Sequence, residues 1–356
     1  MTAATVAPQY SGVDLPAERV APAASGLPLP VSDIADVPLV TLDEIREAAE
    51  RLRGIAVRTP LLPFPAAGPA AWLKPESLQP VGAFKIRGAY VAIARLPEAV
   101  RRRGVVTHSS GNHAQGIARA ARLLGVKAVA VMPENAPRLK VQRTQADGAE
   151  IVFSGSAPDE RVALAQRIAE QRGMTLIPSY DSRDIIAGQA TVGLEIAEDA
   201  PGGPLTVYVP VGGGGLASGV ATALKKLRAD VRVVGVEPEL AADALESLRD
   251  GRIVRWPAER TARTMADGLR VQALGRIPFA HLRAFLDGIV TVTEDEIAAA
   301  MRVLAIDARL VVEPSGAAAP AALLRERPAD GASVAIVSGG NVDPDLYARV
   351  LAGGTP

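Results

Sequence analysis

The chain has 356 residues, with 39 Lys and Arg against 39 Asp and Glu, three histidines and no cysteine. This length is enough for two structural domains, and the balanced charge gives no general attraction to nucleic acid or to an anionic membrane; a small neutral or zwitterionic ligand fits better. Without cysteine there is no disulfide or thiolate chemistry, and so few histidines argue against a histidine-bound catalytic zinc. No apolar run is long enough for a membrane helix and the N-terminus lacks the basic-then-apolar layout of a secretion signal, so we expect a cytoplasmic protein.

Residues 1–38 are rich in Ala, Pro, Gly and Ser and predict a disordered extension. A capping box at residues 41–44, followed by apolar residues at helical spacing, indicates that the folded part begins there. Apolar strands then alternate with helices. The predicted strands are 104–107, 126–132, 150–153, 174–177, 206–211, 231–236 and 333–337, and the helices are 113–124, 137–147, 159–172, 184–199, 294–307 and 316–326. This alternation predicts the α/β class, with parallel sheets covered by helices on both faces.

One lysine, Lys85, lies in an otherwise apolar segment flanked by Gly82 and Gly88. Burial would favour its neutral amine, which is the nucleophile that Schiff-base chemistry needs. The alternative is a lysine at the start of a helix whose ammonium reaches water.

The loop after the predicted strand 104–107 carries Ser109, Ser110 and Asn112 just before a helix. Backbone N–H groups and small polar side chains at such a turn suit a carboxylate or a phosphate. The alternative is a polar cluster that only caps the helix.

Two further strands end in glycine loops. Gly212–Gly215 precede a helix and place no side chain between the backbone amides and an anion, so a phosphate is the best interpretation. A relaxed dinucleotide fingerprint also fits this loop, with Glu237 as the ribose-binding acid. In the other loop Ser338 offers one hydroxyl to a ring nitrogen, unless the loop is an ordinary turn. Together with Lys85, the three loops suit pyridoxal phosphate, which combines an aldehyde, an anion and a heteroaromatic nitrogen.

Four motifs occur in a specific order: Phe84-Lys85-Ile86-Arg87-Gly88-Ala89, Ser110-Gly111-Asn112-His113, the four glycines, and Ser338-Gly339-Gly340-Asn341. On these motifs the chain from Thr41 to Leu351 resembles the fold type II pyridoxal-phosphate enzymes, in particular the serine/threonine dehydratase and serine racemase family. The resemblance implies a two-lobed fold like that of the tryptophan synthase β subunit. Residues 39–103 and 181–356 would form a large cofactor-binding domain and residues 104–180 a small mobile one, in a homodimer or homotetramer.

The resemblance also implies a role for each site residue. Lys85 would bind the cofactor aldehyde and act in catalysis together with Ser110. The other expected cofactor contacts are Phe84 on the ring, Asn112 at the ring hydroxyl, Gly212, Gly213, Gly214, Gly215 and Leu216 at the phosphate, Gly268 on the other ring face, and Ser338 at the pyridine nitrogen. The expected substrate contacts are Ser109, Ser110, Gly111, Asn112, His113 and Arg161.

A segment that follows the predicted strand 231–236 resembles the divalent-cation loop of the racemase branch. The carboxylates of Glu237 and Asp243 and the carbonyl of Ala241 are hard oxygen donors, which suit Mg²⁺, Ca²⁺ or Mn²⁺. The alternative is an acidic turn in solvent.

The activity that the resemblance implies is elimination of the β-hydroxyl from L-threonine or L-serine, giving a 2-oxo acid and ammonia, with Lys85 as general base. Ser110 leaves serine racemase with dehydratase side activity as an alternative, although Ala83, Val162 and the absence of serine in residues 268–271 depart from the racemase pattern. Hydroxyaspartate ammonia-lyase is a further alternative, and a nucleotide-binding module without catalysis is one of another class. The short stretch after Asn341 leaves no room for an isoleucine-sensing domain, so we expect no feedback inhibition of that kind.

Overall fold

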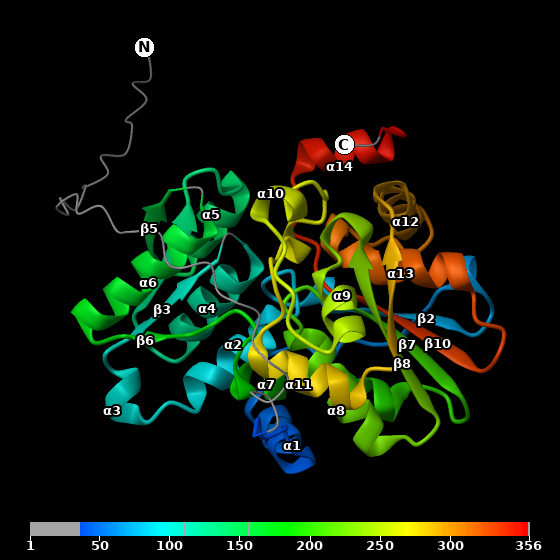
Figure 1. Cartoon of the computed structure of the whole chain (residues 1–356), viewed down its shortest axis with the longest axis horizontal. Coiled ribbons are helices and arrows are strands. Elements are labelled where there is room, and N and C mark those ends of the chain that lie inside the picture. The colour runs from blue at the N-terminus through cyan, green and yellow to red at the C-terminus, as the bar shows by residue number, and fades with distance from the viewer. Residues whose placement is uncertain (1–35, 110, 156, 355–356) are drawn as a thin grey trace.

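The computed structural model describes residues 36–109, 111–155 and 157–354, which form two sheets with helices packed around them (Figure 1). The six-stranded sheet has the order β1-β2-β10-β7-β8-β9 and the four-stranded sheet the order β5-β4-β3-β6. The strands are β1 (Leu62–Pro63), β2 (Ala71–Pro75), β3 (Val105–His108), β4 (Ala128–Pro133), β5 (Glu150–Ser154), β6 (Thr175–Leu176), β7 (Leu205–Pro210), β8 (Val231–Pro238), β9 (Gly288–Val292) and β10 (Ala332–Val337). Every pair is parallel except β1 with β2. The predicted α/β class is confirmed.

Helices cover both sheets. They are α1 (Leu42–Arg51), α2 (Lys85–Ala94), α3 (Glu98–Arg101), α4 (Asn112–Leu123), α5 (Arg138–Ala146), α6 (Pro158–Arg172), α7 (Arg183–Asp199), α8 (Gly215–Leu227), α9 (Asp243–Asp250), α10 (Ala258–Thr261), α11 (Arg276–Phe285), α12 (Glu294–Ile306), α13 (Pro314–Glu326) and α14 (Pro344–Leu351). The capping box is present, because the Thr41 side chain accepts from the Glu44 N–H and the Glu44 side chain accepts from the Thr41 N–H. None of the described helices has the length and apolar character needed to cross a membrane.

Helix α2, which begins at Lys85, is placed by a close crossing with α7. A Cβ at Gly88 would lie 2.8 Å from the Ile185 carbonyl oxygen, and a Cβ at Gly188 would lie 2.5 Å from the Gly88 Cα. Two glycines facing each other therefore let the backbones touch, where any larger side chain would push the helices apart.

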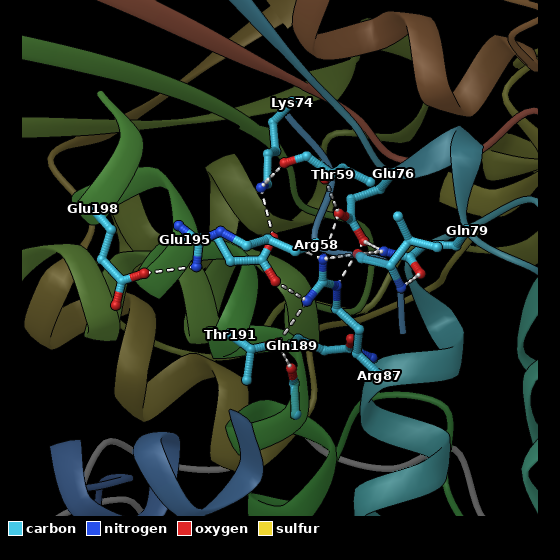
Figure 2. A network of polar contacts seen from close by, with 12 residues as sticks. Arg58, Thr59, Lys74, Glu76, Gln79, Arg87, Gln189, Thr191, Glu195 and Glu198 are labelled. Atoms are coloured by element: carbon cyan, nitrogen blue, oxygen red, sulfur yellow. Dashed lines mark hydrogen bonds and ion pairs between the residues drawn. The ribbon is translucent and has the colours of Figure 1, made fainter. Parts of the chain in front are cut away.

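A buried ionic network joins the same helix to the six-stranded sheet and to α7 (Figure 2). Arg87 is 1% exposed; its Nε and Nη2 donate to the Glu76 carboxylate at 2.7 and 2.8 Å, and its Nη1 donates to Glu195 at 2.6 Å. Lys74 of β2 donates to the same Glu195 at 2.6 Å. Burial acts to raise the pKa of Glu76, but the charge and hydrogen bonds of Arg87 outweigh it and the pKa is lowered. Both carboxylates are thus held by cations, and α2 is fixed two residues after Lys85.

Breaking this network should destabilise the fold strongly. Arg87→Met leaves Glu76 buried without its cation, so the free energy of unfolding should fall by about 3–5 kcal/mol in urea denaturation followed by circular dichroism. Arg58→Met is the matched control, because its ion pairs with Glu198 and Asp199 lie at a half-exposed surface and should contribute less than about 1 kcal/mol. Equal losses in the two variants would contradict the role given to the buried network.

Candidate active site

A cavity of about 530 Å³ lies where strands of both sheets end. The loops that follow β3, β7 and β10 all reach it, and so does the start of α2. The predicted site residues that line it are Phe84, Lys85, Ser109, Gly111, Asn112, His113, Arg161, Gly212, Gly213, Gly215, Leu216, Gly268 and Ser338. Ser110 lies outside the described residues. Gly214, Glu237, Ala241 and Asp243 do not line the cavity.

The lysine segment and the last of the three loops are joined directly. Ala83 forms an isolated β-bridge with Gly339, and the Phe84 N–H donates to the Ser338 carbonyl at 3.1 Å. The Lys85 amine lies 4.9 Å from the centre of the Phe84 ring and donates to the Ser179 carbonyl at 3.1 Å. Burial lowers the pKa of Lys85 to about 8. This favours the interpretation of Lys85 as a nucleophile over the alternative of a lysine whose ammonium reaches water.

The four glycines make a tight turn into the amino end of α8. Gly212 and Gly214 have φ of +53° and +93°, which favours glycine, and a Cβ at Gly213 would overlap the ring of Tyr180. The first amides of α8 have no partner inside the helix and carry the positive end of its dipole. The turn is therefore a suitable cradle for a phosphate, and it has no space for side chains.

A neutral hydroxyl lies at the end of β10. Ser338 is buried and donates to the Ser315 carbonyl at 3.3 Å, while the Ser315 hydroxyl accepts from the Gly268 N–H at 2.8 Å. Ser338 and Gly268, which the sequence places far apart, thus meet through Ser315. With Lys85 and the phosphate cradle, these residues fit an aldehyde, an anion and a ring nitrogen of pyridoxal phosphate.

Several residues that line the cavity were not among the predicted site residues. Lys140 on α5, Asp267, Glu313 and Tyr180 all face the cavity. Burial, followed by the charges of Asp181 and Asp243, raises the pKa of Tyr180 to about 12, so it stays a neutral phenol. The loop Pro178-Ser179-Tyr180 does follow a predicted strand, which is the one signal that could have found it.

The polar side chains near the Ser109 loop differ in their partners. His113 is buried, and burial followed by the Lys85 charge lowers its pKa well below the usual value, so it is neutral. Arg161, in the first turn of α6, has no ion pair among the described residues, and its buried Nε lacks a hydrogen-bond partner there. Burial lowers its pKa as well. A guanidinium in this state can receive an anion.

The predicted cation loop lies at the end of β8, away from the cavity. The Glu237 carboxylate accepts from the Ala244 and Leu245 N–H groups of α9 at 3.2 and 2.8 Å, so it is not directed at the four glycines as a ribose-binding acid would be. Asp243 is 0% exposed, and neither of its carboxylate oxygens has a hydrogen-bond partner among the described residues. Burial raises the pKa of Glu237, as does the charge of Asp243. Among the described residues no group of three or more His, Cys, Asp or Glu could hold a metal, but the orphaned Asp243 carboxylate fits a cation bound by fewer side chains.

Comparison with known proteins points to one family. Residues 52–339 match the family model of pyridoxal-phosphate dependent enzymes. The chain is 42% identical to the L-threonine ammonia-lyase of Thermotoga maritima over 88% of this chain and 78% of the relative. It is 43% identical to the L-threo-3-hydroxyaspartate ammonia-lyase of a Pseudomonas species over 88% of this chain and 99% of the relative.

Solved structures agree with the fold. Maize serine racemase superimposes with a TM-score of 0.83 at 35% identity, covering 89% of this chain and 98% of the racemase. The threonine deaminase of T.th. has a TM-score of 0.80 at 42% identity, covering 85% and 99% of the two chains. The predicted fold type and cofactor are confirmed, and the chain belongs to the pyridoxal-phosphate dependent enzymes.

Proposed function

We propose that the protein is an ammonia-lyase that removes the β-hydroxyl and the amino group of L-threonine or L-serine, giving a 2-oxo acid and ammonia. The observation that carries this proposal is the enclosed amine of Lys85 in one cavity with the four-glycine turn. The relatives named L-threonine ammonia-lyase support the same reaction class. Bound pyridoxal phosphate supplies an aldehyde for amines and an electron sink for the α-carbon.

The residues of this chain would then divide the work. The amino end of α4 and the Ser109–His113 loop receive the substrate carboxylate, since that helix end is positively polarised. The Lys85 Nζ removes the α-proton as general base, and its lowered pKa suits this task near neutral pH. Asn112 would hold the cofactor ring hydroxyl, and Ser338 would face the ring nitrogen. A neutral hydroxyl there does not hold a proton on that nitrogen.

We also propose that residues 39–103 and 181–356 form the large cofactor-binding domain and residues 104–180 a smaller mobile one. All four strands of the smaller sheet come from residues 105–176, which supports this division. A cytoplasmic location and a homodimer or homotetramer are further parts of the proposal.

A second candidate substrate is L-threo-3-hydroxyaspartate, and Arg161 favours it. Arg161 is half-buried and its buried Nε has no hydrogen-bond partner among the described residues, so a second carboxylate on the substrate would supply that partner through a charge-assisted hydrogen bond. The Pseudomonas relative is named for this substrate.

The first test removes the proposed nucleophile. Lys85→Ala should abolish ammonia release and the visible absorbance of covalently held cofactor, while Lys127→Ala, at an exposed lysine, should keep both. Because burial lowers the pKa of Lys85 to about 8, capture of pyridoxal phosphate by cofactor-free protein should accelerate up to about pH 8 and then level off. Wild-type rates of ammonia release by Lys85→Ala would contradict the proposed role of Lys85.

The second test separates the substrates. Ammonia release is measured for threonine, serine and threo-3-hydroxyaspartate with wild-type enzyme and with Arg161→Gln. If Arg161 binds a second carboxylate, kcat/KM should fall about 10- to 100-fold for hydroxyaspartate and little for threonine, as expected for one charge-assisted contact. Equal losses would assign Arg161 to the carboxylate that all three substrates share.

Chiral analysis of unreacted serine tests the racemase alternative. If D-serine forms faster than pyruvate, serine racemase is the main activity and dehydration the side reaction.

We propose in addition that Mg²⁺, Ca²⁺ or Mn²⁺ binds Glu237, Asp243 and the Ala241 carbonyl. The cation would neutralise a buried carboxylate that has no hydrogen-bond partner among the described residues. At a hundred times its Kd a cation adds about 2.7 kcal/mol of stability, so Tm should rise on its addition and fall with a chelator. Asp243→Asn should lose this response, and Asp345→Asn, at an exposed site, should retain it. An unchanged response in Asp243→Asn would contradict the proposed ligand set.

A further inference from the structure

Two cationic side chains of helix α5 contact residues that follow the six-stranded sheet or its helices, and one of them, Lys140, also lines the cavity. The Lys140 amine donates to the Asp267 carboxylate at 2.5 Å and lies 3.6 Å from the Glu313 carboxylate. Arg143, three residues further along the helix, donates to the Asn341 side chain. Since α5 belongs to the half built on the four-stranded sheet and its partners belong to the other half, these contacts join the two halves directly.

The partners of Lys140 and Arg143 converge on Asn112. The Asn112 amide nitrogen donates to Glu313, and the Asn112 carbonyl oxygen accepts from the Asn341 amide at 2.8 Å. Asn341 also donates to the Val81 carbonyl at 2.8 Å. A flip of the Asn112 amide would set its oxygen against the Glu313 carboxylate and its N–H₂ against the Asn341 N–H₂. The network therefore fixes the orientation of the Asn112 amide.

Three glycines leave space for this network. A Cβ at Gly339 would overlap a Glu313 carboxylate oxygen, and one at Gly82 would lie 2.6 Å from the Asn341 side-chain oxygen. A Cβ at Gly111 would lie 3.0 Å from the Lys140 side chain. Gly111 and Gly339 belong to two of the sequence motifs and Gly82 flanks the Lys85 segment, so close packing of these polar side chains explains part of why these segments contain glycine.

Charge balance makes Lys140 the central member. Glu313 is 1% exposed, and burial raises its pKa while the Lys140 charge acts in the opposite direction. Lys140 is 4% exposed, yet its pKa is raised because the charges of Glu313 and Asp267 outweigh burial. One Glu313 carboxylate oxygen has no hydrogen bond among the described residues, and the Lys140 ammonium forms an ion pair with that oxygen at 3.6 Å. Without Lys140, the buried Glu313 would lose its compensating charge.

We propose that Lys140 is a positioning residue that ties α5 to Glu313 and Asp267 across the cavity and thereby holds the Asn112 amide in its orientation toward the cofactor. The inference rests on the proposed function, because Asn112 meets the cofactor ring there. Lys140 acts through Glu313 and needs no contact with the substrate. Through Lys140, the position of the half built on the four-stranded sheet affects the orientation of Asn112 in the cofactor site.

The test compares Lys140→Met, which keeps an apolar stem, with Lys140→Arg, which keeps the charge. Arg138→Met, at an exposed position of the same helix, is the matched control. Lys140→Met should weaken equilibrium binding of pyridoxal phosphate about tenfold or more, the loss expected for one charge-assisted contact. It should also shift the pH titration of the visible cofactor band and speed amide hydrogen exchange in residues 138–146. Lys140→Arg should keep all three readouts close to those of the wild-type enzyme, and Arg138→Met should change none of them.

A Lys140→Met enzyme with wild-type cofactor affinity, band and exchange would overturn the proposal. Should that variant fail to fold, Glu313→Gln replaces it, because it removes the partner charge and keeps an oxygen for Asn112. Faster exchange in α5 would again support the proposal, and unchanged exchange would overturn it. Failure of the proposed function is distinguishable: wild-type protein would then release no ammonia from threonine, serine or threo-3-hydroxyaspartate, while cofactor affinity and amide exchange would still report whether Lys140 holds α5.

Discussion

The burial of one guanidinium between two carboxylates is the interaction on which the active-site geometry depends. Arg87 spans Glu76 and Glu195, and so ties α2 to the end of β2 and to α7. Since Lys85 lies only two residues before Arg87 on the same helix, anything that moves the guanidinium also moves the amine. The ionic network is expensive to desolvate, and its value lies in fixing one position of α2.

The cavity combines two kinds of order. One comes from backbone: strand ends and glycine turns place amides and carbonyls at fixed points, as at Gly212–Gly215. The other comes from buried side chains with complementary charge, as between Lys140 and Glu313. The backbone features suit the parts of a cofactor that carry charge, and the side-chain network connects the two halves of the molecule around them. A buried amine with a lowered pKa is useful only because both kinds of order hold it still.

Local patterns predicted most of the alternation of strands and helices, and each predicted element between residues 104 and 337 lies within two residues of the observed one, but β9, α9 and α11 were not predicted. Strand β2 was not predicted, because Lys74 and Pro75 interrupt its apolar run, and the strand owes its burial to partners in β10 and α7. The glycine loops and Lys85 could be recognised from the local sequence, because their residue types and neighbours indicate their chemistry. Lys140 and Glu313 could not be recognised in this way, because they are 173 positions apart and become a pair only through the fold.

The glycine-to-glycine crossing of α2 and α7 has a consequence for changing what the enzyme accepts. Gly88 and Gly188 bring these two backbones into contact, so the wall that carries Lys85 cannot be widened without separating the helices. Selection for new substrates, in nature or in the laboratory, must therefore act on other parts of the cavity wall. Side chains of α6 and of residues 270–273 also line the cavity, and they are not held by this glycine-to-glycine contact.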